Sequence, residues 1–424
     1  MRVLLLIPTT AYRAADMLDA AAAEGVDVAV GADQPPVLAQ TTGGGLWVDL
    51  SDPERAAAQI AEHHARHPLA AIVGVDEGTA TIAACASQAL GLPHNPPAAA
   101  AAAGNKRRFR DALTHAGVPQ PPYRVIPPEA PAADAARVVN HYPAVIKPVG
   151  LAGSRGVLRA DDAEAGTAAI ERARAIARAT DPATGLDPDP TVLVEGYLPG
   201  GEVALEGLLY GGELHILALF DKPDPLDGPT FPETIFTTPS RLPTSSQEAV
   251  RARTQAAVTA LGLREGPIHA ELRLTPDDGP VPLEVAARAI GGLCGRVLRF
   301  GAGVSLERLI LRHALGRAPA PPDRETTPAG VMMVPIREDG RLVRVDGVDA
   351  ARAVPGIAEV TITVAPGTHI RPLPEGDRYL GFLFARADEP ARVEQRLREA
   401  AESLHPVIEP ADGGGHGARA APRW

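Results

Sequence analysis

Strand and helix signals alternate through the first hundred residues, and this alternation is the strongest constraint on the fold. Residues 2–8 read RVLLLIP, a short apolar run typical of a buried strand, and residues 14–25 show a helical pattern. A second strand is expected at 26–32, and the pair recurs as a strand at 69–77 and a helix at 79–91. This rhythm predicts a parallel sheet with helices on its faces.

The composition limits the class of protein. The 424 residues suffice for two to four domains, and 41 basic against 52 acidic residues give a net charge of −11, which disfavours nucleic-acid partners. Cys85 and Cys294 are the only cysteines, too few for a disulfide framework or a zinc site. The first residues lack a signal-peptide pattern, and no apolar run reaches membrane-spanning length. We therefore expect a cytoplasmic protein without a membrane partner.

A lysine and a glycine-rich loop follow one predicted strand. Residues 142–160 read YPAVIKPVGLAGSRGVLRA, in which Lys147 closes the apolar run and Ser154 lies in the loop 150–156. Exposed backbone amides and a fixed ammonium group suit a phosphate chain. The glycine spacing matches neither the Walker A pattern nor the dinucleotide fingerprint, so a strand–turn–strand without a ligand is an equal alternative. The glycine run at 43–45 follows no clear strand and is expected to be a flexible turn.

The remaining chain is predicted to be mixed. Helix signals cover five segments: 105–117, 162–180, 246–261, 305–317 and 389–403. Strands are expected in 191–220, on both sides of the Asp-Asp-Gly turn at 277–279, and through 330–387. Because alanine is abundant throughout, alanine-rich stretches alone are weak evidence for helices. The polar, glycine-rich tail 411–424 is expected to be disordered.

Two carboxylates lie on the predicted strands around that turn. Glu271 and Glu284 are each surrounded by apolar residues, and on paired strands they can point to the same face. Two such carboxylates repel unless they share a proton or hold a divalent cation, and Mg²⁺ prefers oxygen ligands together with nucleotide phosphates. Arg288, four residues beyond Glu284, could neutralise charge on a phosphoryl group or an oxyanion. Solvated glutamate–arginine pairs are an equal alternative.

In this order the motifs resemble the ATP-grasp superfamily of carboxylate–amine ligases. The resemblance covers about residues 1–320 and includes the helix that begins near Lys106, the lysine–glycine loop and VEGYLPGGE. It implies a Rossmann-like parallel α/β domain, a two-lobed ATP-grasp core of mixed α+β structure and a β-rich C-terminal appendage. The implied segments are the N-terminal domain, the two lobes, the appendage and a disordered tail: 1–103, 104–188, 189–325, 326–408 and 409–424.

The resemblance also implies the site residues. The positions that match contacts to the phosphates of ATP are Lys106, Lys147, Gly153, Ser154 and Gly156. The positions that match the adenine hinge and the ribose carboxylate are Glu195, Leu198 and Glu202. Glu271 and Glu284 match ligands of Mg²⁺ or Mn²⁺, and Arg288 matches the catalytic arginine. A carboxylate accepts two hydroxyl groups, which suits Glu202, whereas a solvated lysine is the alternative for Lys106.

Further motifs resemble the branch that ligates L-amino acids into dipeptides. LEVAAR has Ala286 where many ATP-grasp enzymes carry an asparagine, which removes one oxygen ligand. Segment 330–372 resembles the appendage of these ligases, and segment 227–243 resembles their substrate loop, in which Glu233 would face the amino acid. A surface position is the alternative for Glu233. Relatives carry a histidine near the place of Phe236, so the side-chain pocket is expected to differ.

The implied reaction joins an amino-acid carboxylate to an amine through an acyl phosphate and releases ADP and phosphate. Arg288 and Lys147 would be catalytic, and Glu233 and Arg288 would contact the substrate. His269 and Cys294 match no motif role and are interpreted as structural. The alternatives are an ATP-grasp carboxylase or formyl-phosphate enzyme of purine biosynthesis, a biotin-carboxylase-like activity, and an inactive nucleotide-binding subunit. A homodimer and a place in antibiotic biosynthesis are compatible with the resemblance.

Overall fold

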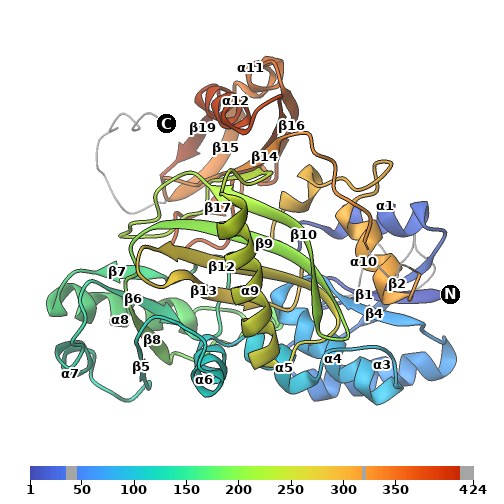
Figure 1. The fold of residues 1–424 in the computed structure, drawn as a ribbon, viewed down its shortest axis with the longest axis horizontal. Coiled ribbons are helices and arrows are strands. Elements are labelled where there is room, and N and C mark those ends of the chain that lie inside the picture. Colours follow the sequence, from blue (N-terminus) through green and yellow to red (C-terminus); the bar gives the residue numbers. More distant parts are fainter. Residues whose placement is uncertain (35–44, 318–320, 411–424) are drawn as a thin grey trace.

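The computed structural model describes residues 1–34, 45–317 and 321–410. Its strands form four sheets, of which a large antiparallel sheet occupies the centre of the molecule (Figure 1). The expected fold class, a parallel N-terminal sheet followed by a mixed core and a β-rich C-terminal region, is confirmed. The tail 411–424 and the glycine run, except Gly45, lie outside the described residues.

The N-terminal sheet is parallel and has the order β3-β2-β1-β4. Its strands are β1 (Arg2–Leu6), β2 (Asp27–Ala32), β3 (Gly45–Trp47) and β4 (Ala71–Gly74). Its helices are α1 (Ala14–Ala23), α3 (Pro53–Arg66), α4 (Glu77–Leu90) and α5 (Pro97–Ala103). Val3 and Leu5 pack toward α1, whereas Leu4 and Leu6 pack toward α3 and α4. The strand is therefore apolar on both faces because helices cover both faces.

Two of these helices differ from the expectation. α3 was not predicted, although Asp52 caps it by accepting the amides of Glu54 and Arg55 and Pro53 stands at its first position. α5 begins with Pro97 and continues through an alanine run. Alanine is the best helix former, so this alanine run does indicate a helix, although alanine is abundant throughout the chain.

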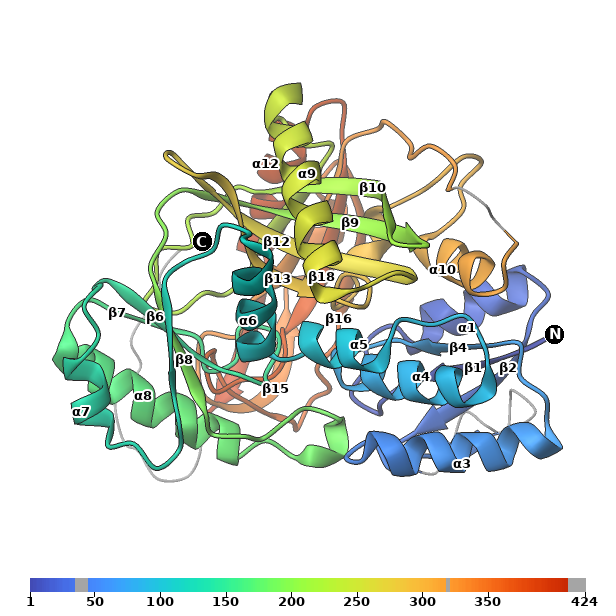
Figure 2. The same ribbon diagram turned by 60° about the horizontal axis from the view of Figure 1, so that its bottom comes forward.

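A small antiparallel sheet follows in the order β5-β8-β6-β7. Its strands are β5 (Tyr123–Ile126), β6 (Ala144–Pro148), β7 (Leu158–Ala160) and β8 (Val192–Gly196). The helices of this region are α6 (Lys106–Ala116), α7 (Ala132–Arg137) and α8 (Ala163–Arg178). α7 and α8 cover the small sheet, and α6 packs beside α5 and α9 (Thr244–Leu261) (Figure 2).

The large sheet has eight strands in the order β13-β12-β9-β10-β11-β14-β18-β16. Its core strands are β9 (Gly201–Tyr210), β10 (Glu213–Lys222), β11 (Ile235–Thr238), β12 (Gly266–Thr275) and β13 (Gly279–Ala286). α9 covers one face of these strands. The other face shares a continuous core with β1, α1, α10 (Leu306–Ala314) and the short helix η2 (Cys294–Val297). The parallel sheet and the large sheet are thus packed together.

The C-terminal region extends the large sheet. Its strands in that sheet are β14 (Ala329–Val334), β16 (Ile357–Ile362) and β18 (Gly381–Arg386). A small sheet in the order β17-β15-β19 contains β15 (Gly340–Asp346), β17 (His369–Ile370) and β19 (His405–Glu409). The helices are α11 (Val348–Ala353) and α12 (Pro390–Glu402). Across the described ranges, no helix is both long and apolar enough to span a bilayer.

Candidate active site

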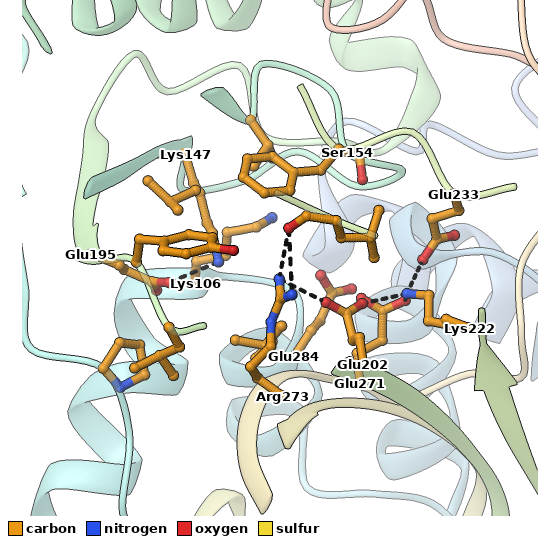
Figure 3. A pocket seen from close by; sticks show the side chains of 18 of the residues that line it. Lys106, Lys147, Ser154, Glu195, Glu202, Lys222, Glu233, Glu271, Arg273 and Glu284 are labelled. Carbon is orange, nitrogen blue, oxygen red and sulfur yellow. Dashed lines mark hydrogen bonds and ion pairs between the residues drawn. The ribbon is translucent and has the colours of Figure 1, made fainter. Parts of the chain in front are cut away.

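Two adjoining cavities lie between the small sheet, the large sheet and the C-terminal region. We call the first the lysine cavity, because Lys106, Lys147 and Lys222 line it (Figure 3). We call the second, of about 170 Å³, the tyrosine cavity, because Tyr12 and Tyr379 line it. The residues that line both are Gly153, Ser154, Glu233, Glu271 and Glu284. The chain has only three lysines, and all three lie in the lysine cavity.

Lys106 and Lys147 enter the lysine cavity from separate elements, as predicted. Lys106 begins α6, whose N-terminus is capped by the Asn105 side chain, and its ammonium group donates to the carbonyl oxygen of Leu151. Burial lowers the pKa of Lys106, and the Glu284 carboxylate opposes this shift. Lys147 lies on β6 with its Nζ 2.7 Å from Glu195 Oε2. Both cations are therefore held in place by partners within the chain.

Glu195 anchors this side of the cavity through its side chain. The carboxylate is buried and lies 2.7 Å from both Arg110 Nε and Lys147 Nζ. Burial would raise the pKa of Glu195, but the Arg110 and Lys147 charges outweigh it and hold the pKa at about 2. Arg110, which was not predicted, also donates to the carbonyl oxygens of Pro282 and Leu283 on β13. Leu198 lines the same cavity. The adenine-hinge role stays a prediction, and the ion pair was not foreseen.

Glu202 lies in a ladder of opposite charges across three strands. Its register partners are Lys222 on β10 and Arg273 on β12. One carboxylate oxygen accepts from Lys222, and the other lies 3.1 Å from Arg273. Neither partner was predicted. Two cations already contact the Glu202 carboxylate, and its role in binding the ribose stays a prediction.

Glu271 and Glu284 are direct register partners on β12 and β13, as the sequence suggested. The other acidic neighbours were not foreseen: ligand oxygens of Glu202, Glu233 and Glu271 lie within 4.8 Å of one another. The Lys222 ammonium group lies among them, 2.7 Å from Glu233 and 3.1 Å from Glu271 (Figure 3). Burial and the negative charge of Glu271 raise the pKa of Glu233 to about 8. Glu233 is therefore a wall of the site rather than a surface residue.

His269 and Cys294, which were interpreted as structural, both line the tyrosine cavity, and Cys294 also belongs to the buried core. The Nδ1 atom of His269 lies 2.5 Å from Glu206, and its Nε2 atom lies 3.4 Å from Glu271. Burial would lower the pKa of His269, but its bonds to these two carboxylates raise it to about 10. The fully buried Glu206 also accepts the amide of Ile290. One carboxylate thus connects the His269 ring to the segment that follows Arg288.

Arg288 meets the end of the N-terminal sheet. Its Nε donates to Glu77 at 2.9 Å, and one terminal nitrogen lies 4.0 Å from Glu284. Glu77 is the first residue of α4 and was not predicted. Burial would lower the pKa of Arg288, but the Glu77 and Glu284 charges raise it above its usual value. The guanidinium is therefore a permanent cation in the wall of the tyrosine cavity.

The glycine loop lies over both cavities through Gly153 and Ser154. Both residues have left-handed φ values, 65° and 58°. Gly156 is absent from the linings of both cavities, and its amide donates to the carbonyl oxygen of Pro374 at 3.0 Å. The predicted phosphate contact of Gly156 therefore lacks support, because its one backbone donor already has a partner.

The donor set fits a nucleoside triphosphate with a divalent cation. The ammonium groups of Lys106 and Lys147 and a loop with few side chains suit phosphates, and converging carboxylate oxygens suit Mg²⁺ or Mn²⁺. Glu271, which belongs to the carboxylate cluster with Glu202 and Glu233, would hold the ion together with its register partner Glu284. Lys222 presently neutralises the carboxylates beside them.

Three segments of the chain match known families. Residues 18–94 match the ATP-grasp N-terminal domain, residues 140–297 match the ATP-grasp domain, and residues 332–409 match the L-amino acid ligase C-terminal domain 2. The chain therefore belongs to the ATP-grasp superfamily. Its C-terminal region matches the domain family that is described for L-amino acid ligases.

Individual relatives show the same relationship. An uncharacterized protein from Sinorhizobium fredii is 30% identical over 325 residues, 75% of this chain, and carnosine synthase 1 from Gallus gallus is 32% identical over 62% of it. The matched segments span 64% and 29% of those two proteins. The crystal structure of L-amino acid ligase from Bacillus licheniformis superposes with a TM-score of 0.82 at 24% identity, covering 96% of this chain and 98% of that one.

Proposed function

We propose that this protein is an ATP-dependent ligase that joins the carboxylate of an amino acid to an amine and releases ADP and phosphate. The observation that carries the proposal is the meeting of two cavities at Glu233, Glu271 and Glu284. Lysines lie on one side of this boundary, and Arg288 lies on the other. A nucleotide in the first cavity would therefore present its phosphates to a substrate in the second.

In the first step, a carboxylate oxygen attacks the γ-phosphorus of ATP, and the bond from that phosphorus to the bridging oxygen of ADP breaks. Lys106 and Lys147 neutralise charge on the phosphates, and Ser154 and Gly153 cover them. A divalent cation held by Glu271 and Glu284 would supply further positive charge where the bond breaks. The product is an acyl phosphate.

In the second step, the amine nitrogen attacks the carbonyl carbon of the acyl phosphate. The carbon–nitrogen bond forms, the carbon–oxygen bond to phosphate breaks, and the amine loses a proton. Arg288 stabilises the oxyanion of the tetrahedral intermediate. The glycine loop excludes water, which would otherwise hydrolyse the acyl phosphate.

The proposal is tested by the products of turnover with pairs of amino acids. We expect ADP and phosphate in equal amounts, each matched by one amide bond, and a hydroxamate when hydroxylamine replaces the amine. AMP as the main nucleotide product would contradict the placement of the cations around the β and γ phosphates. ADP release that needs bicarbonate would favour a carboxylase, and nucleotide binding without turnover would favour an inactive subunit.

A further inference from the structure

The tyrosine cavity has an apolar wall built from five segments of the chain. Tyr12 comes from the segment after β1, Phe236 from β11, Met333 from β14, Cys294 from η2 and Tyr379 from the segment before β18. Phe236, Met333 and Cys294 are each 3% exposed or less. Binding against such a wall is favourable when a ligand covers it with apolar surface. Binding is unfavourable when the ligand buries a polar group there without a hydrogen-bond partner.

Two hydrogen bonds fix this wall beside the acidic boundary. The hydroxyl of Tyr379 accepts the amide of Glu233 at 3.2 Å, and the hydroxyl of Tyr12 accepts the amide of Tyr379 at 3.3 Å. The Tyr12 ring also packs on Phe382 with 5.3 Å between ring centroids. The aromatic rings therefore keep their places relative to Glu233, where the proposed reaction would occur.

The floor of the cavity has no side chains at two successive positions. Gly291 and Gly292 both line it. A Cβ atom on Gly292 would lie 2.7 Å from the Phe382 ring, and its φ is 60°, so a larger residue is excluded there. A Cβ atom on Gly291 would meet no heavy atom within 4 Å. The space above Gly291 is open.

Besides the acidic boundary, His269 and Arg288, three charged side chains line the cavity: Arg155, Asp377 and Arg378. Arg378 Nε donates to Asp377 at 2.7 Å, and both side chains are at least 40% exposed. Arg155 is half-buried, and one of its terminal nitrogens donates to the hydroxyl of Thr180 at 3.2 Å, whereas its buried Nε has no hydrogen-bond partner among the described residues. The Arg378–Asp377 pair is therefore exposed to solvent and self-paired, whereas the wall opposite the acidic boundary offers apolar contacts.

We propose that the tyrosine cavity selects a carboxylate-donor amino acid with a large apolar side chain, such as leucine, methionine or phenylalanine, and that Gly291 provides the room for it. This inference rests on the proposed function. The donor's carboxylate lies at the boundary with the lysine cavity, and its side chain points toward Tyr12, Met333 and Tyr379. Burial of such a side chain gives about a ten- to hundredfold preference over alanine in kcat/KM.

Hydroxylamine trapping tests the preference with one amino acid at a time, because only the carboxylate donor forms a hydroxamate. We expect phenylalanine, leucine and methionine to exceed alanine, aspartate and lysine by about tenfold or more in kcat/KM. Equal or better rates with the small or charged amino acids would overturn the inference and leave the ligase function intact.

If no amino acid supports turnover, the proposed function fails. Thermal unfolding with a non-hydrolysable ATP analogue then tests the cavity alone. A higher unfolding temperature with phenylalanine but not with alanine would still support the selectivity of the cavity. No such difference would overturn the inference.

Variants at Gly291 test directly whether the open space above this residue accommodates the donor side chain. Gly291→Leu should lower kcat/KM for phenylalanine at least about tenfold while alanine is still used, and Gly291→Ala should fall between. Retained use of alanine also shows that the variant is folded. Parallel loss of all amino acids in the two Gly291 variants, or no change of profile, would overturn the role of Gly291.

Discussion

Lys222 shows how one residue organises this site. Of the 41 basic residues of the chain, three are lysines and the rest are arginines, so lysine persists only where the lysine cavity needs it. A compact ammonium group can lie among three carboxylates, whereas a planar guanidinium favours paired contacts with one. The ammonium group also lies 5.1 Å from the centre of the Phe236 ring. Lys222 therefore keeps Glu202, Glu233 and Glu271 together.

Replacing Lys222 by methionine keeps the side chain's bulk and removes its charge. Three carboxylates would then repel one another, so we expect the free energy of unfolding to fall by about 3–5 kcal/mol. Mg²⁺ should restore part of this loss, because a divalent cation binds the folded cluster and not the unfolded chain. Urea unfolding with and without Mg²⁺ measures both effects.

The exposed pair Arg66–Glu62 provides the control for this experiment. Arg66→Met also removes a cation from an ion pair, but in solvent, and should change the free energy of unfolding by less than about 0.5 kcal/mol. A Lys222→Met protein that is as stable as the wild type, or that does not respond to Mg²⁺, would contradict the ordering role of Lys222.

Glu195 predicts a specific loss of stability in acid. Its folded pKa of about 2 lies below the ordinary value of 4.5, so its contribution is present above pH 4.5 and disappears as the pH falls toward 2. The shift corresponds to roughly 3 kcal/mol. The free energy of unfolding of the wild type should fall toward that of Glu195→Gln over this interval. A constant difference between the two proteins from pH 6 to 3 would contradict the ion pair with Arg110 and Lys147.

At the scale of elements, two β-bulges decide which side chains meet. Counting from the turn at 277–279, Leu283 would oppose Glu271, but an irregularity after Leu272 brings Glu284 to that position. Counting from the other turn, Asp221 would oppose Glu202, but the bulge between Ile216 and Ala218 brings Lys222 there. A shift of one residue moves a side chain to the other face of a strand.

These bulges explain how much of the site the sequence could predict. Family motifs predicted Lys106, Lys147 and Glu284 as site residues, and all three line the lysine cavity. The strand pattern predicted that the strands of Glu271 and Glu284 are paired, as the structure shows. The position of Lys222 depends on a bulge that no local pattern marks, and Glu77 reaches Arg288 from 211 residues away. Periodicity also identified most helices and strands, because each carries its own apolar pattern, whereas contacts between distant elements carry no such local signal.

The glycine loop 150–156 should change its dynamics with the nucleotide. We expect its amides to exchange hydrogen faster without a ligand and to gain protection with a non-hydrolysable ATP analogue. Gly156 is expected to differ from Gly153, because its amide already donates to Pro374. Hydrogen exchange measured by mass spectrometry with and without the analogue checks this. Equal protection in both states would favour a plain turn and leave Lys147 as the phosphate contact of this segment.

At the scale of the whole molecule, the C-terminal region and the N-terminal sheet share one core. Phe382 on β18 is fully buried in the same cluster as Val3 and Leu5 of β1. β14 joins β11 to β18, so the large sheet continues across the predicted boundary near residue 326. Tyr12 and Tyr379 bring residues from both ends of the chain to one cavity. The substrate wall therefore depends on regions that are far apart in sequence.

Phe382→Ala tests this shared core. Removal of a fully buried ring should lower the free energy of unfolding by about 3–5 kcal/mol. Because the core is continuous, we expect calorimetry to show one transition that shifts as a whole, rather than separate melting of the C-terminal region. The ring also supports Tyr12, so the KM for the amino acid should rise while the KM for ATP changes little.

Ile170→Ala separates lost stability from lost substrate contact. Ile170 is also buried, but it lies in the core between α8 and the small sheet, away from the tyrosine cavity. This variant should be destabilised by about 2–5 kcal/mol without a change in the KM for the amino acid. If Phe382→Ala melts the C-terminal region alone and leaves a second transition unshifted, the shared core is not one cooperative unit. If both variants raise the KM for the amino acid equally, the change reflects stability rather than the Tyr12 wall, because only Phe382 contacts that wall.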